Sequence, residues 1–81
     1  MAKEIGKVFA YYSNIGVAAI KLSGALKVGD TIAIKGHTTD ITQRAESIQI
    51  EHEKVKEAKK GDEVGIKVKD RVRPNDVVYK D

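Results

Sequence analysis

Residues 29–35 read Gly-Asp-Thr-Ile-Ala-Ile-Lys, and residues 61–67 repeat the pattern as Gly-Asp-Glu-Val-Gly-Ile-Lys. Glycine allows the positive φ angle of a tight turn, the following aspartate can hydrogen-bond the nearby backbone, and the aliphatic residues two and four positions later fall on one strand face. Asn75 and Asp76, followed by Val77, begin a third and weaker copy. The repeat therefore predicts an all-β chain in which turns of one kind start successive strands.

Residues 24–31 imitate a phosphate-binding loop, because they place two glycines five positions apart ahead of a threonine. Such a loop requires a lysine directly after the second glycine, where it binds the terminal phosphates of a nucleotide. Asp30 occupies that position, and the residues after it alternate like a strand instead of opening a helix. We therefore expect a β-turn here and no nucleotide binding.

The length and composition of the chain narrow its class. With 81 residues, the chain is expected to form a single domain over residues 1–81. It has no cysteine, which excludes a disulfide framework and a thiolate metal site. No apolar run approaches the roughly 20 residues of a membrane span, and the first residues lack the apolar core of a signal peptide. We expect a cytoplasmic location and no membrane contact.

Most of the chain alternates apolar and polar residues as strands do, and residues 13–16 have the composition of a hairpin turn. Six or seven short strands without a long helix predict a small antiparallel barrel, closed or partly open. Strands are expected over residues 4–12, 17–22, 41–50, 63–69 and 77–80, and a third strand in chain order points Ile32 and Ile34 inward. Leu26 and Val28 form a short apolar return ahead of that third strand.

The predicted strand over residues 41–50 changes phase. Ile41 and Ala45 share one parity, whereas Ile48 and Ile50 share the other. A β-bulge near residues 46–47 would return both sets to the core, because one extra residue moves every later side chain to the opposite face.

Residues 51–60 have the composition of a helix, with Val55 and Ala58 on one side. At about two turns, such a helix is too short to be stable alone. We expect it to connect two strands and to plug one end of the barrel with these two apolar side chains.

Four motifs occur here in the order and spacing of a known family: residues 6–8, 24–32, 45–48 and 58–66. Together they resemble domain 2 of translational GTPases such as elongation factor Tu, across essentially the whole chain. The resemblance implies the translation-protein type of β-barrel. In that family the barrel does no chemistry; it packs against the GTPase domain, contacts the small ribosomal subunit in several factors and helps to hold the aminoacyl end of tRNA. A similar barrel is an accessory domain of collagenase-like peptidases.

The resemblance also assigns positions to the aminoacyl pocket of elongation factor Tu. An ungapped alignment over residues 48–65 places the carboxylate of that pocket at Gln49, its arginine at His52 and its asparagine at Glu63. None of the three side-chain types is retained, and Glu63 would place unfavourable charge near an RNA terminus. The resemblance therefore implies the fold more than it implies binding of aminoacyl-tRNA.

No group of residues in the sequence predicts catalysis. His37 and His52 stand in different predicted loops without the spacing of metal ligands. Asp62 and Glu63 are neighbours on a strand and point to opposite faces, so they cannot act together as acid and base. We expect a protein that is not an enzyme and that holds no metal or cofactor.

The best candidate for a binding site is a basic series with a period of two residues. If the strand continues past residue 69, the four cations project from one exterior face and can follow a phosphate backbone. Alternatively, they form a solvated strand face that deters edge pairing. The predicted contacts to nucleic acid or to a partner are Lys67, Lys69, Arg71 and Arg73.

The sequence leaves two functions open. The first is a non-catalytic binding module that contacts RNA, the ribosome or a translation-related protein. The second is a protein-interaction or accessory barrel for a separate GTPase or a collagenase-like peptidase. The formal net charge of +3 is too small to indicate nucleic-acid binding by itself, so charge does not choose between them.

Overall fold

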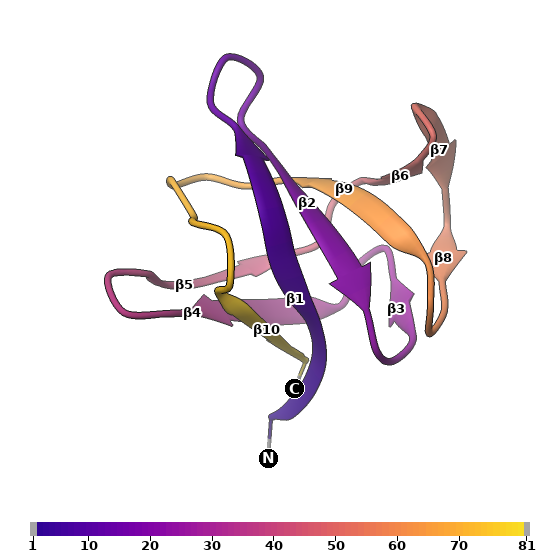
Figure 1. Cartoon of the computed structure of the whole chain (residues 1–81). Helices are drawn as coiled ribbons and strands as arrows, with labels where there is room; N and C mark the ends of the chain where they lie inside the picture. Colours follow the sequence, from indigo (N-terminus) through magenta and orange to yellow (C-terminus); the bar gives the residue numbers. More distant parts are fainter. Residues whose placement is uncertain (1, 81) are drawn as a thin grey trace.

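The computed structural model describes residues 2–80, which contain ten strands and no helix. Figure 1 shows the strands wrapping around one interior, with both ends of the chain at the same side. No helix that could cross a membrane is found among these residues. The strands are β1 (Lys3–Tyr12), β2 (Val17–Leu22), β3 (Leu26–Lys27), β4 (Thr31–Lys35), β5 (Asp40–Arg44), β6 (Ile48–Ile50), β7 (Glu53–Val55), β8 (Glu57–Ala58), β9 (Glu63–Lys67) and β10 (Val77–Lys80).

Eight of the strands form one antiparallel sheet in the order β5-β4-β10-β1-β2-β9-β6-β7, and β3 pairs with β8 in a second, two-stranded sheet. The expected all-β, antiparallel and barrel-like fold is therefore confirmed. The strands are more numerous than the six or seven expected, because residues 41–50 are divided between β5 and β6, and residues 51–60 form β7 and β8 in place of a helix. The ladder is open between its edge strands β5 and β7.

The interior is filled by aliphatic side chains from every long strand. The alternation expected in the two Gly-Asp copies is confirmed, since Ile32 and Ile34 are buried in β4, and Val64 and Ile66 are buried in β9. Because one face of each strand packs inward, the other face is left for solvent or for partners. The largest fully buried side chains belong to Ile5, Val8, Ile20, Leu26, Ile32, Ile34, Ile48, Ile66, Val72 and Val78.

The three predicted turns have the same geometry, at Asp30, Asp62 and Asp76. Each aspartate carboxylate accepts a hydrogen bond from the backbone N–H three residues earlier, at 2.9, 2.9 and 2.8 Å. Each aspartate N–H donates back to the carbonyl of that same residue, at 3.0, 3.0 and 3.1 Å. The residue before each aspartate has a positive φ of 98°, 94° or 78°, as the third position of a type II turn requires. These turns are structural, and no nucleotide loop is formed at the first of them.

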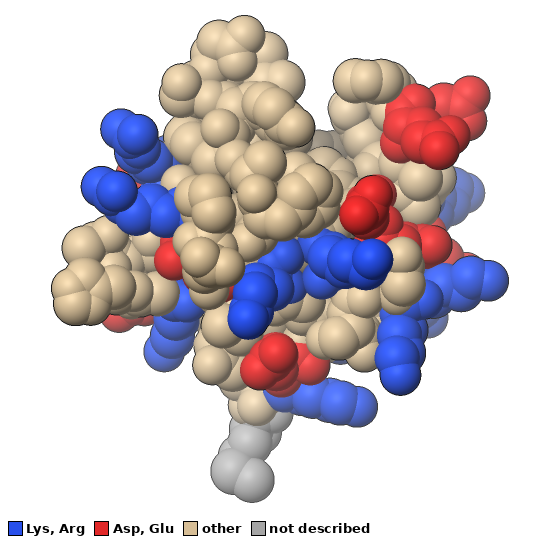
Figure 2. Space-filling view, viewed as in Figure 1, with Lys and Arg blue, Asp and Glu red and all other residues tan. Residues whose placement is uncertain are grey.

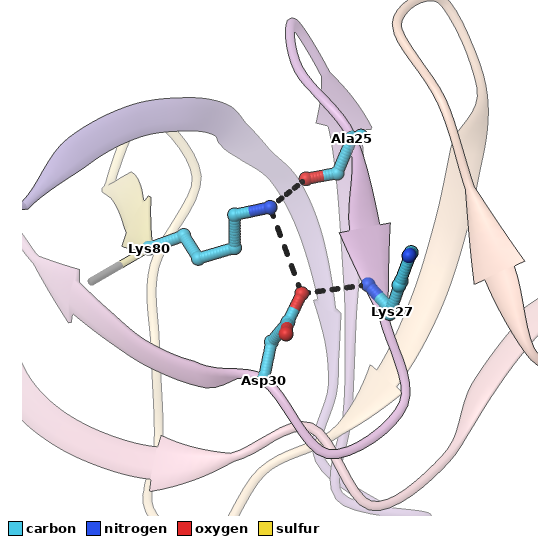
Figure 3. A network of polar contacts seen from close by, with 4 residues as sticks. All are labelled: Ala25, Lys27, Asp30 and Lys80. Atoms are coloured by element: carbon cyan, nitrogen blue, oxygen red, sulfur yellow. Dashed lines mark hydrogen bonds and ion pairs between the residues drawn. The ribbon is translucent and has the colours of Figure 1, made fainter.

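The first turn is also tied to the last strand (Figure 3). Asp30 Oδ2, which accepts from the N–H of Lys27, lies 3.6 Å from Lys80 Nζ. The same ammonium group donates to the carbonyl of Ala25 at 3.0 Å. Lys80 therefore links β10 to the segment around β3, which is far from it in sequence.

The helix expected over residues 51–60 is wrong. This stretch instead forms β7 and β8, and Glu51 and His52 make the two-residue turn between β6 and β7. A helix of two turns gains little by itself, whereas pairing satisfies the backbone groups at the free edge of β6. Ala58 is buried and Val55 is half-buried in their strands, so both still pack toward the core, as expected.

The expected phase change lies in the right place, but it is not a β-bulge. β5 pairs with β4, whereas β6 pairs with β9 and β7, so residues 45–47 leave the ladder and carry the chain from one part of the sheet to another. Ala45 and Ile48 are both fully buried. The residues before and after the phase change therefore both face the core, as expected. The cause is a change of partner strand and not a bulge within one ladder.

Candidate functional site

The basic loop, defined as residues 67–73, differs from the expected strand. β9 ends at Lys67, so the strand does not continue past residue 69. The period-two exposure is present only in part: Val68 and Val72 are buried between exposed cations, whereas Asp70 is exposed like its neighbours. In Figure 2, basic side chains gather at the left, over the loop that follows β9. The exposed cations of the basic loop are Lys67, Lys69, Arg71 and Arg73.

Gln43 of β5 fixes the start of the basic loop. Its side-chain amide donates to the carbonyl of Lys67 at 2.8 Å and accepts from the N–H of Lys69 at 2.9 Å. These are the two kinds of hydrogen bond that a neighbouring strand would supply. One side chain therefore bridges the opening between β5 and the residues after β9.

A cleft of about 310 Å³ lies along this bridge. Arg44, Lys67 and Lys69 line it together with Ser47, and Glu46 is the one carboxylate among the lining residues. Arg44 was not part of the predicted series, because it stands far from the others in sequence. The arrangement suits an anionic group, whose binding would depend on salt because all three cations are exposed.

Replacing Gln43 with alanine is expected to release the basic loop without unfolding the barrel. Two hydrogen bonds of ordinary net strength are lost, so the free energy of unfolding should fall by about 1–2 kcal/mol. The amide hydrogen of Lys69 should exchange faster in hydrogen-exchange NMR, since its acceptor is gone. Thr42→Ala, at an exposed position of the same strand, is the control. Unchanged exchange at Lys69 would contradict the bridging role.

The second candidate surface is the uncharged hairpin, residues 8–20, which contains no Lys, Arg, Asp, Glu or His, although charged residues make up 33% of the chain. Among residues 2–80, three of the four exposed large hydrophobic residues lie on it: Phe9 is 48% exposed, Tyr12 50% and Ile15 57%. Figure 2 shows this hairpin as a lobe without charge at the top, separated by a hollow from the β6–β7 turn, where acidic side chains gather.

Phe9 and Tyr12 face outward for different reasons. Phe9 follows the buried Val8, so the alternation of β1 already exposes it. The register between β1 and β2 then shifts between Val8 and Ala10, which makes Phe9 the extra residue of a β-bulge. After the bulge, Tyr11 packs against the core and Tyr12 faces outward, the reverse of what uninterrupted alternation from Val8 would give.

The hollow is a cleft of about 200 Å³, which we call the hairpin cleft. Ala19, Gly65 and Gln49 are register neighbours across β2, β9 and β6 and form its floor. A Cβ at Gly65 would lie 3.2 Å from Val17 Cγ1, so a side chain there would have to displace Val17 by a few tenths of an ångström. The lining residues are Phe9, Tyr12, Ile15, Val17, Ala19, Gln49, Glu51, His52, Glu63, Val64 and Gly65.

The structure brings together the three positions that the alignment assigned to the aminoacyl pocket. Gln49, His52 and Glu63 all line the hairpin cleft. In this chain the three positions carry an amide, an imidazole and a carboxylate, beside the small residues Ala19 and Gly65 of the floor. The hairpin side chains that complete the cleft were missed by the sequence analysis. The signal that could have found them is the absence of charge over residues 8–20.

Residues 2–80 include no group of three or more His, Cys, Asp and Glu side chains that could hold a metal ion. His37 lies in the β4–β5 loop and His52 in the β6–β7 turn. The carboxylate of Asp62 accepts the turn hydrogen bond, whereas that of its neighbour Glu63 lines the hairpin cleft. β9 begins at Glu63, so Asp62 belongs to the turn and the two are not neighbours on a strand, contrary to the prediction.

The known proteins that are similar to this chain include two curated proteins and one solved structure. An uncharacterised protease of Methanocaldococcus jannaschii is 47% identical over 77 residues, which are 94% of this chain and 19% of that protein. A collagenase of Porphyromonas gingivalis is 44% identical over 78 residues, 94% of this chain and 22% of that protein. The chain thus spans about a fifth of the length of these relatives.

The solved structure is the C-terminal domain of a putative U32 peptidase of Geobacillus thermoleovorans. It is 25% identical, with a TM-score of 0.89, and the match covers 95% of this chain and 90% of that domain. The family model of elongation factor Tu domain 2 matches residues 19–78, which include every strand from β3 to β9, most of β2 and half of β10. This chain belongs to the elongation factor Tu domain 2 family.

Proposed function

We propose that this chain is a non-catalytic interaction module, an accessory barrel that packs against a peptidase-type protein. The observation that carries the proposal is the uncharged hairpin, whose exposed aromatic and aliphatic side chains resemble the centre of a protein interface more than an ordinary surface. The choice of a peptidase-type partner comes from the relatives, because a protease and a collagenase each contain a segment 44–47% identical to this chain.

The dimensions of the cleft also favour a protein partner over a small molecule. Pockets for small molecules usually have volumes of roughly 300–1,000 Å³, whereas the hairpin cleft has about 200 Å³. Phe9 and Tyr12 stand beside it as the type of side chain that contributes most to protein association. A surface of this kind suits one or two side chains of another protein.

The test uses the Methanocaldococcus jannaschii protease from which the segment similar to this chain has been removed. Titration calorimetry should show a one-to-one complex between this truncated protease and the chain, with a Kd of about 10 μM or tighter. Peptidase assays of the chain alone should show no turnover. The absence of any heat or complex at concentrations of about 100 μM would reject the proposed function.

A second candidate function, RNA binding, is favoured by the position of Arg44 beside Lys67 and Lys69. Replacing the four cations of the basic loop with alanine should then weaken binding to single-stranded RNA and lower the salt slope by about 3. A matched control removes four other cations, at Lys54, Lys56, Lys59 and Lys60. Equal losses in the two variants would exclude the basic loop as an RNA site.

A further inference from the structure

We propose that the hairpin cleft binds a segment of the peptidase-type partner that carries an apolar side chain next to a lysine or arginine. The apolar side chain lies on the floor of the cleft, and the basic group lies near Glu51 and Glu63. This inference rests on the proposed function, and it adds the surface that docks and the chemistry of the segment that it accepts.

The floor and the walls of the hairpin cleft are the reason to expect an apolar side chain in the bound segment. Ala19 and Gly65 keep the floor low, while Phe9, Tyr12 and Ile15 rise along one side. These three residues are about half exposed, so a partner side chain placed among them removes apolar surface from water on both molecules. None of them has to move out of the core to make the contact.

The charge of the hairpin cleft is the reason to expect a lysine or arginine in the bound segment. Glu51 and Glu63 are exposed lining residues, and none of the lining residues is a lysine or arginine. Lys21 lies 4.0 Å from Glu63, with both side chains 62% exposed, so this pair is weak and Glu63 can accept a cation from a partner. A basic side chain complements the cleft, whereas an acidic one is repelled.

The turn between β6 and β7 supplies an independent observation. Glu51 and His52 have φ angles of 51° and 67°, and a two-residue turn with both φ values positive strongly prefers Asn-Gly. Neither residue is glycine, so the chain gives up stability at this turn. Both side chains line the hairpin cleft. The strained residues are therefore those that a bound segment would contact.

The experiment measures binding to the same truncated protease for variants of the cleft. Ile15→Ser combined with Phe9→Ser should raise the Kd at least 10-fold, because interface anchors of this type dominate affinity. Glu51→Lys combined with Glu63→Lys should raise it by a similar factor and make the remaining binding less sensitive to salt. Val28→Ser, at an exposed apolar position away from the cleft, and Asp40→Lys are the matched controls.

One variant separates binding from stability. Glu51→Asn with His52→Gly should raise the Tm by roughly 4–8 °C, since it relieves the turn, yet it should weaken binding because two cleft side chains are lost. If the parent chain binds and all the cleft variants bind equally well, the inference is overturned and the proposed function stands. If the parent does not bind, the proposed function fails and this inference fails with it. A dimer of the chain alone that dissociates in the Ile15 and Phe9 variant would identify a second copy as the occupant, which also overturns the inference.

Discussion

Replacing Gly36 with alanine is expected to lower the free energy of unfolding by about 2–4 kcal/mol. Gly36 follows β4, and a methyl group there would overlap Asp76 Oδ1 and lie 2.6 Å from Asp76 Cγ. The carboxylate cannot move aside, because Asp76 is only 4% exposed and accepts a hydrogen bond from the N–H of Arg73 at 2.8 Å. Either the strand end shifts or the third turn opens.

The effect should be measured by urea unfolding together with a double-mutant cycle. Asp76→Ala removes the group that the methyl would meet, so adding Gly36→Ala to it should cost less than about 0.5 kcal/mol more. Gly61→Ala is an informative comparison, because its φ is 94° and a Cβ there meets no atom within 4 Å. That variant should lose only about 1–2 kcal/mol, from backbone strain alone. Additive losses for Gly36→Ala and Asp76→Ala would show that the two positions do not clash.

The turns could be predicted from the sequence because their causes are local. Within four residues, the sequence contains the residue with positive φ, the carboxylate and the N–H that the carboxylate accepts from, as at Asp30 and Asp62. The aliphatic positions that follow alternate, so the inward face of β4 and of β9 could also be predicted. The resemblance to a known family then predicted how these turns and strands assemble into a barrel.

The end of β9 could not be predicted, because a partner strand sets it. β2 begins at Val17, which pairs with Lys67, and the last bond of this ladder runs from Val68 N–H to the carbonyl of Gly16 at 2.9 Å. No alternation of charge in the sequence reports where a neighbouring strand starts. The four cations of the basic loop are therefore exposed, but the straight strand expected for them is absent.

The hairpin cleft also could not be predicted from local sequence patterns. Its walls come from β1, β2, β6 and β9, and one of them depends on the bulge after which Tyr12 faces outward. Its rim depends on a turn at Glu51 and His52, within a segment whose composition favours a helix. In each case a tertiary or inter-strand contact overrides a local preference, which is why this site emerges only when the strands are assembled.

Replacing Ile66 with alanine should be the most damaging truncation in the core. Ile66 is paired with Ala18 of β2 on one side and Ile48 of β6 on the other, and all three side chains are 0% exposed. The removed atoms leave a cavity that two ladders prevent from collapsing, so the loss should reach about 2–5 kcal/mol. A domain of this size has a total stability of roughly 4–12 kcal/mol, so the variant should lie close to unfolding at 37 °C.

Urea unfolding of a series of truncations of increasing size measures this loss of unfolding free energy. Ile66→Val should cost about 0.5–1.5 kcal/mol, and Ile41→Ala, at a half-buried position on the edge strand β5, should cost clearly less than Ile66→Ala. Equal losses for Ile41→Ala and Ile66→Ala would mean that β9 is not the centre of the core. Gly65, the neighbour of Ile66, points the other way and forms the floor of the hairpin cleft. If that floor is held by the two ladders and not by the core side chain, Ile66→Val should bind the truncated protease as the parent does, despite its lower stability.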